Sequence, residues 1–190
     1  MRNKNLKILI DLLSDAGVLK TIRRTGWILK GVEEVESVAD HSWRVAFFSL
    51  ILAKPGLNKQ KLIEMALVHD LGEIGVGDIK WETGGKVLSS PKTKHMDELV
   101  AIKKLFGKFK DSKKYVALLK EYNKQSSPEA KFLKQIDKLE MVVQAMEYEQ
   151  MGYPSYLFNE FWNNTKKYLK GESLEPLFIA LQNKRDKNKD

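Results

Sequence analysis

Apolar residues recur at intervals of three and four along almost the whole chain, and this pattern is the strongest constraint on the fold. Leu6, Leu9, Ile10 and Leu13 are the first example. This spacing places apolar side chains on one face of a helix, whereas the alternation typical of a strand is rare here. Because 190 residues suffice for one well-filled core, we expect a compact, single-domain, all-α fold.

Local signals give the expected helix boundaries. Gly17 should end the first helix, and Ser37 with Asp40 forms a capping box for another. Ser127 and Pro128 predict the start of a helix that runs to about Gln150. Further helices are expected over residues 155–170 and 174–183, and loops over residues 23–36 and 79–94. The domain should cover residues 1–183, with residues 184–190 as a disordered basic tail.

Charge and composition limit the kind of protein this is. The formal net charge of +8 could attract a phosphorylated substrate or simply solvate the surface. The basic residues do not gather on one helix face, so we do not expect nucleic-acid binding. No apolar run is long enough to span a membrane, and no signal peptide is recognised, so we expect a cytoplasmic protein. The chain has no cysteine, which excludes thiolate metal sites and cysteine nucleophiles.

His69 and Asp70 are adjacent at the predicted end of an apolar helix. Asp70 falls on the apolar stripe of that helix, where a carboxylate is costly to bury without a partner. Glu73 follows one turn later. A metal ion would satisfy this compact set of nitrogen and oxygen ligands. The alternative is a solvated aspartate beside a histidine that only ends the helix.

Asp137 and His41 are unusual in the same way. Asp137 lies among apolar residues of a long helix, so it needs either a metal or a salt bridge, for example with an arginine. His41 is followed by Trp43 and Phe47, which predict a buried helix in which a histidine could be a satisfied core residue. Read together with His69, these side chains could coordinate one divalent metal and leave positions open for water and substrate.

Five sequence blocks in order resemble the HD-domain phosphohydrolase superfamily, and within it the HD-domain 5′-deoxynucleotidases. The resemblance covers roughly residues 5–165. One His-Asp dipeptide is a weak signal, whereas five blocks with the right spacing are specific. The blocks are Arg24-Thr25-Gly26-Trp27, Glu36-Ser37-Val38-Ala39-Asp40-His41, Ala66-Leu67-Val68-His69-Asp70, Glu73 with Gly77-Asp78-Ile79, and Glu129-Ala130-Lys131-Phe132 leading to Asp137.

This resemblance implies a helical HD-domain fold and a metal-dependent phosphoric monoester hydrolase. The expected reaction converts deoxyribonucleoside 5′-monophosphates to deoxynucleoside and phosphate by attack of a metal-bound water. Glu73 corresponds to a catalytic carboxylate, and Asp78 to an acidic residue at the substrate or, with Glu73, at a second metal. The family's four metal ligands correspond to His41, His69, Asp70 and Asp137.

The resemblance also assigns substrate contacts. Arg24 is the expected phosphate clamp and catalytic cation, and Trp27 the contact for the sugar or base. Some bacterial members have arginine directly before this tryptophan, where this chain has Gly26, so Arg23 is an alternative clamp. Trp27 could equally be a core anchor. Ile79 and Lys80 beside Asp78 complete the expected substrate-binding residues, whereas His95 is expected to be solvated or, less favoured, to contact phosphate.

Several properties stay open at this stage. Co, Mn or Mg is the expected metal, with Fe, Ni and Zn as alternatives. A homodimer is expected from the family. An HD-type phosphodiesterase or nucleotide triphosphohydrolase is the alternative activity, because one metal site supports several reactions. A non-catalytic, basic helical protein that binds nucleic acid or regulates a partner is the second alternative. Base preference and discrimination against ribose are not visible in the sequence.

Overall fold

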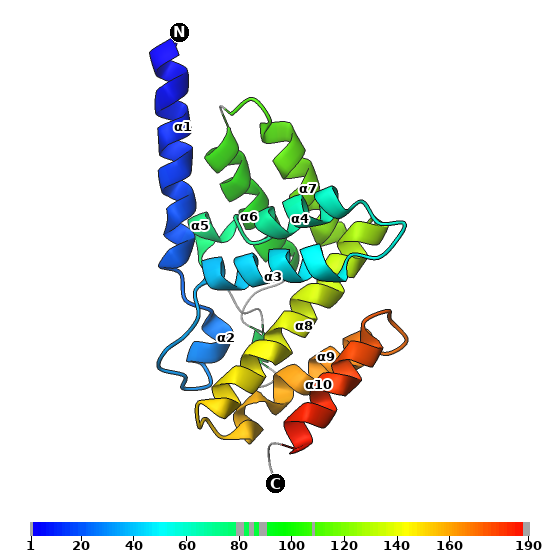
Figure 1. The fold of residues 1–190 in the computed structure, drawn as a ribbon. Coiled ribbons are helices and arrows are strands. Elements are labelled where there is room, and N and C mark those ends of the chain that lie inside the picture. Colours follow the sequence, from blue (N-terminus) through cyan, green and yellow to red (C-terminus); the bar gives the residue numbers. More distant parts are fainter. Residues whose placement is uncertain (1, 79–81, 84–85, 88–90, 108, 188–190) are drawn as a thin grey trace.

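The computed structural model is almost entirely helical, as the periodicity predicts (Figure 1). It describes residues 2–78, 82–83, 86–87, 91–107 and 109–187. The α-helices are α1 (Arg2–Ala16), α2 (Thr25–Ile28), α3 (Val38–Leu52), α4 (Lys59–Val68), α5 (Glu73–Val76), α6 (Pro91–Phe106), α7 (Ser112–Lys124), α8 (Pro128–Gln150), α9 (Asn159–Leu169) and α10 (Glu175–Lys187). The remaining elements are the 3₁₀ turns η1 (Gly17–Lys20) and η2 (Ser155–Phe158) and the antiparallel strands β1 (Glu82–Thr83) and β2 (Lys86–Val87).

Helix α8 is the centre of the fold. It crosses the molecule diagonally, with α3, α4 and α7 packed along one part and α9 and α10 along another (Figure 1). Its inward side chains, among them Leu133 and Ile136, are fully buried. Burying each such side chain contributes roughly 1.5–3 kcal/mol to folding. The same buried stripe carries Asp137, so the core helix also supplies a polar group to the site.

The predicted caps form at both helices that matter most for the site. The Ser37 hydroxyl accepts from the Asp40 backbone N–H, and the Asp40 carboxylate accepts from the Ser37 backbone N–H, which fixes the start of α3. The Ser127 hydroxyl accepts from the Ala130 N–H at the start of α8, with Pro128 in the first turn. These bonds satisfy backbone donors that have no partner within the helix.

Helix α3 is only half buried, which corrects the prediction of a buried helix around His41. His41, Val45 and Ser49 face the core, whereas Trp43 is 65% exposed and Phe47 is 46% exposed. The two exposed rings stack on each other with an interplanar angle of 3°. Apolar residues lie on both sides of this helix, so their presence alone did not decide which side would be covered. In the described part of the chain, no helix combines the length and apolarity needed to cross a membrane.

Two further expectations need correction. Residues 23–36 include the short helix α2, although they were predicted as a loop. Helix α10 continues to Lys187, so residues 184–187 are not a disordered tail. Arg185 is the physical reason, because its buried guanidinium donates to Glu149, to the Ser155 carbonyl and to Asn159. Residues 188–190 lie outside the described residues.

Candidate active site

A polar cavity of about 420 Å³ lies where α8 meets the ends of α4 and α7 and the start of α6. The predicted residues Arg24, His69, Asp70, Glu73, Asp78 and Asp137 all line it, although they come from three separate regions of the sequence. His41 approaches the same point from α3, with its Nε2 atom 3.3 Å from Asp137 Oδ1. The fold therefore brings together the side chains that the sequence singles out.

Two buried imidazoles each present an Nε2 atom without a hydrogen-bond partner among the described residues. These atoms belong to His41 and His69, whose side chains are almost completely buried. In each ring the other nitrogen is engaged: His41 Nδ1 lies 2.5 Å from Glu140 Oε2, and His69 Nδ1 lies 2.6 Å from the Ala66 carbonyl oxygen. Buried polar atoms normally have partners, so two neighbouring imidazole nitrogens without one indicate that these side chains bind a ligand.

Carboxylates complete this set. Asp70 Oδ2 lies 3.3 Å from His69 Nε2 and 3.7 Å from His41 Nε2. The candidate ligand atoms of His41, His69 and Asp137 all lie within 4.8 Å of one another. Two imidazole nitrogens and the Asp137 carboxylate within this distance, with Asp70 beside both imidazoles, are donors suited to a divalent transition metal, so the residues present fit such an ion.

The other oxygen of Asp137 is held by hydrogen bonds. It accepts from the Tyr122 hydroxyl at 2.9 Å and from the Lys134 ammonium at 2.7 Å. These partners replace the arginine considered as an alternative. Although burial opposes it, Lys134 and His41 hold the pKa of Asp137 well below its usual range. Burial and the Arg24 charge lower the pKa of His41, but Glu140 and Asp137 raise it more, to about 10.

Glu73 is a second buried carboxylate with an unpartnered oxygen. Its side chain is fully buried at the start of α5, and Oε2 has no hydrogen-bond partner among the described residues. Its Oε1 accepts from the Lys94 ammonium at 3.1 Å. Burial, followed by the charges of Asp70 and Asp78, raises the pKa of Glu73 to about 9. Near neutral pH this carboxyl group therefore holds a proton that it can donate.

Asp78 is anchored to the segment that carries the predicted phosphate clamp. Its Oδ2 accepts from the Thr25 backbone N–H at 2.7 Å, and the Thr25 hydroxyl donates to its carbonyl oxygen. The Lys94 ammonium lies 4.0 Å from Asp78 Oδ1 and 3.1 Å from Glu73 Oε1, so a cation already stands between these carboxylates. The second metal at Glu73 and Asp78 stays a prediction.

Of the two candidate arginines, Arg24 is the one in the cavity. Its Nη1 atom lies 3.4 Å from Asp70 Oδ2 and 4.0 Å from Asp78 Oδ1. Arg23 instead donates to the Val35 carbonyl at 2.6 Å. Arg24 can thus reach a ligand at the site although Gly26, and not arginine, directly precedes Trp27. The hydrogen bond from the Thr25 backbone N–H to Asp78 holds this segment at the cavity.

Trp27 is chiefly a core residue. Its ring is 1% exposed, packs against Tyr148, Phe158 and Phe161, and donates its indole N–H to Glu36 at 2.8 Å. It also lines a small cavity of about 90 Å³, which shares Arg24, Asp78 and Met141 with the main cavity. Its predicted substrate contact remains a prediction. Ile79 and Lys80 lie outside the described residues.

Sequence reasoning missed several cations of the cavity. Lys94, Lys134 and Lys138 all line it. Lys134 and Lys138 lie three residues before and one residue after Asp137, so the helical spacing around Asp137 could have indicated them. Lys94 gave no such signal, because it falls in a segment expected to be a loop. His95 also lines the cavity and is partly buried, so it is not simply a solvated residue. Burial lowers its pKa, and Lys134 and Lys94 lower it further.

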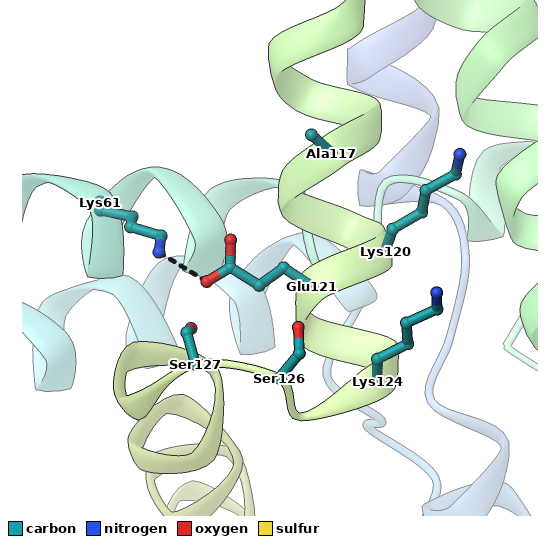
Figure 2. A pocket seen from close by; sticks show the side chains of 7 residues that line it. All are labelled: Lys61, Ala117, Lys120, Glu121, Lys124, Ser126 and Ser127. Atoms are coloured by element: carbon teal, nitrogen blue, oxygen red, sulfur yellow. Dashed lines mark ion pairs between the residues drawn. The ribbon is translucent and has the colours of Figure 1, made fainter.

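A second depression lies between α4, α7 and the start of α8 (Figure 2). In Figure 2, Lys61 reaches across it to Glu121, with Lys61 Nζ 2.6 Å from Glu121 Oε1. Lys120, Lys124 and two serines form the rest of its polar lining. The depression has no imidazole and none of the candidate metal ligands of the described residues. The candidate ligands His69 and Asp137 line the first cavity instead.

Comparisons with known proteins give matches across most of the chain. The family model described as "HD domain" matches residues 16–187. The 5′-deoxynucleotidase HDDC2 of Homo sapiens is 35% identical over 183 residues, which are 95% of this chain and 87% of that protein. The 5′-deoxynucleotidase hdd1 of Schizosaccharomyces pombe is 37% identical over 77% of this chain and 75% of its own length. A solved structure, a conserved hypothetical protein from Pyrococcus furiosus, is 34% identical with a TM-score of 0.76, covering 92% of this chain and 99% of that one.

Proposed function

Because the chain belongs to the HD-domain family, we propose that it is a metal-dependent 5′-deoxynucleotidase that hydrolyses deoxyribonucleoside 5′-monophosphates. The observation that carries this proposal is the pair of buried, unpartnered Nε2 atoms of His41 and His69. They face the carboxylates of Asp137 and Asp70. This donor set fits a divalent cation, and the activity named for relatives across most of the chain supplies the substrate class.

In the proposed enzyme His41, His69, Asp70 and Asp137 hold the metal ion. When bound, a divalent cation there would neutralise phosphate charge and make water a better nucleophile near neutral pH. The protein supplies the rest of the chemistry. We propose Co, Mn or Mg as the ion, with Fe, Ni or Zn as alternatives, since nitrogen and oxygen ligands admit all of them.

The cations of the cavity would bind the phosphate group. Arg24 presents a planar fork of N–H donors that can pair with two phosphoryl oxygens, which a lysine cannot do. The Lys94 ammonium lies 3.6 Å from Glu98 Oε1 and 4.0 Å from Asp78 Oδ1, and these acidic neighbours favour its charged form. Burial and Lys134 lower the pKa of Lys138 to about 8, and an approaching phosphate dianion would favour its charged form.

Glu73 would manage the proton. Hydrolysis breaks the bond between phosphorus and the 5′-oxygen, adds the hydroxyl of water to phosphorus and leaves the 5′-oxygen in need of a proton. Glu73 holds a proton near neutral pH, and its Oε2 has no hydrogen-bond partner among the described residues. It can therefore donate to that leaving oxygen and then take up the proton that the attacking water releases. Asp78 holds the Arg24 segment in place through the Thr25 backbone N–H.

Phosphate release is the direct test. Metal-free protein is given Co²⁺, Mn²⁺ or Mg²⁺ in turn and assayed with deoxyribonucleoside and ribonucleoside monophosphates, with nucleoside triphosphates and dinucleotides in parallel. We expect release from deoxyribonucleoside monophosphates. No release with any metal would contradict the proposal, and turnover of triphosphates or dinucleotides alone would favour the other HD-type activities.

The ligand assignment has its own test. Asp137→Ala should lose bound metal and activity together, measured by metal content after dialysis and by phosphate release. Asp15→Ala is the matched control, because Asp15 is exposed on α1, away from the cavity. If Asp137→Ala retains both metal and activity, Asp137 is only a buried partner of Tyr122 and Lys134.

We also propose that the enzyme is cytoplasmic and that it is a homodimer. Large exposed apolar side chains support the dimer. Trp43 and Phe47 on α3 and Ile10 and Leu13 on α1 are each between 46% and 66% exposed. Contiguous exposed apolar surface commonly marks a protein interface. Light scattering at micromolar concentration should give twice the chain mass of 21.9 kDa, and a monomer at that concentration would contradict the dimer.

A further inference from the structure

The side of His41 that faces away from the cavity carries a buried ion-pair network that the proposed reaction does not use directly. His41 Nδ1 lies 2.5 Å from Glu140 Oε2, and both side chains are 0% exposed. Glu140 lies three residues after Asp137 on α8. One helix therefore contacts both nitrogens of the same imidazole, Asp137 at Nε2 and Glu140 at Nδ1.

Arg44 pairs with the other oxygen of the buried Glu140 carboxylate. Its Nε atom donates to Glu140 Oε1 at 2.8 Å, and its Nη2 atom lies 2.7 Å from the same oxygen. Its Nη1 atom donates to Glu147 at 2.6 Å, and Nη2 also donates to Gln144. A lone buried carboxylate would be strongly destabilising, and this guanidinium compensates it.

Arg44 also explains why a second group of potential metal ligands is not a second metal site. Glu36, His41 and Glu140 offer ligand atoms within 4.8 Å of one another. The Arg44 guanidinium already lies against both carboxylates, with Nη2 3.7 Å from Glu36 Oε2 and 2.7 Å from Glu140 Oε1. The positive charge that balances the carboxylates of Glu36 and Glu140 is therefore the Arg44 guanidinium, and no metal ion is needed there.

We infer that Glu140 is a positioning residue whose carboxylate keeps a proton of His41 on Nδ1. Nε2 is then the nitrogen left for a metal ion, and the ring is held in the orientation that points it at the cavity. A carboxylate acceptor also makes the His41 imidazole a stronger metal ligand than the His69 imidazole, which is oriented by a backbone carbonyl. This inference rests on the proposed metal site, and Co²⁺ binding by the unsubstituted protein tests that site separately.

Metal affinity is the first measurement. Glu140→Gln removes the charge and keeps the shape, and we expect it to bind Co²⁺ about 10–100-fold more weakly in chelator competition. The visible absorption spectrum of bound Co²⁺ should change as well, because His41 is a less basic and less well oriented ligand. Glu147→Gln is the matched control: Glu147 pairs with the same Arg44 but does not contact His41. It should bind Co²⁺ as the unsubstituted protein does.

Nitrogen NMR of the histidine side chains tests the orientation itself. In Zn²⁺-loaded protein, Nδ1 of His41 should carry a proton that is hydrogen-bonded to a carboxylate. This measurement uses the unsubstituted chain, so it decides the question even if Glu140→Gln fails to fold. Glu140→Asp, which keeps the charge on a shorter side chain, should retain more Co²⁺ affinity than Glu140→Gln.

The outcomes separate the two proposals. If the unsubstituted protein binds no Co²⁺, the metal site and hence the proposed function fail, whatever Glu140 does. If it binds Co²⁺ and Glu140→Gln binds equally tightly with the same spectrum, the positioning role is wrong. A His41 whose Nδ1 carries no proton would overturn the role too, and so would a Glu147→Gln variant weakened as much as Glu140→Gln.

Discussion

Gly72, at the start of α5, allows α5 to pack closely on α6. Any other residue type at position 72 would add a Cβ atom that collides with α6. A Cβ atom at this position would lie 2.6 Å from Glu98 Cβ, 2.8 Å from Glu98 Cα and 2.9 Å from the Glu98 carbonyl oxygen. Its backbone dihedrals, φ −61° and ψ −24°, suit any residue, so the demand for glycine is purely steric. Because two of the three contacts are with backbone, Gly72→Ala cannot be accommodated by moving a flexible side chain.

The expected loss of stability follows from this contact. Forcing an extra methyl group into a packed contact destabilises a protein by about 1–3 kcal/mol. Replacing glycine also stabilises by about 0.4–1 kcal/mol, because the unfolded chain loses freedom. Gly17→Ala isolates this second effect, since a Cβ at Gly17 meets nothing within 4 Å. Urea unfolding should therefore place Gly72→Ala roughly 1–3 kcal/mol below Gly17→Ala.

Activity should respond more strongly than stability. Gly72 lies between Asp70 and Glu73, so a shift of α5 moves a candidate metal ligand and the candidate proton donor together. A displacement near 1 Å can lower a rate about 10²-fold. At a temperature where both variants are folded by circular dichroism, Gly72→Ala should lose most phosphate release and Gly17→Ala should lose none. Equal stability and equal activity for the two variants would refute the steric reasoning.

Three further substitutions test separate groups. Glu73→Gln should lower kcat about 10²–10⁴-fold while Co²⁺ binding in equilibrium dialysis is unchanged, and metal loss would contradict a proton-transfer role. Arg24→Lys should raise KM for the monophosphate, because it loses the guanidinium fork, whereas Arg23→Lys should not. The pKa of Glu129 is lowered in the folded protein, chiefly by the Asn58 backbone N–H and also by Lys61. Ionised Glu129 therefore stabilises the fold at pH values above the pKa that this group has in the unfolded chain, and this stabilisation is lost in acid. Unfolding free energies of Glu129→Gln and the unsubstituted protein should thus differ more at neutral pH than in acid, and an unchanged difference would rule this out.

Helix boundaries were predictable because their causes are local. Ser127 with Pro128 and the Ser37–Asp40 capping box act within four residues, and α8 and α3 begin where these signals place them. The rotation of α3 about its own axis was not predictable in the same way. Trp43 and Phe47 are as apolar as the residues on its inner face, and only the packing of α4 and α8 decides which side is covered.

The site was predictable where residue type alone restricts the chemistry. A carboxylate on the buried stripe of α8 requires a partner, and this demand singled out Asp137 before any contact was known. Lys94 was not predictable in this way, because a lysine in a polar segment is normally solvated. It becomes part of the cavity only because α6 packs on α5 and brings its ammonium to Glu73.

The support of His41 shows why the remaining part needs the fold. Arg44 and Glu140 are 96 residues apart, and nothing in either segment indicates that they pair. Their meeting depends on the crossing of α3 and α8, which also brings His41 to Asp137. A slide of α3 along α8 would therefore break the contacts at both nitrogens of His41 at once. Because the same helix crossing positions both His41 and the carboxylate that orients it, the proposed metal site depends on the packing of the core helix. Whatever loosens α3 against α8 should therefore weaken metal binding.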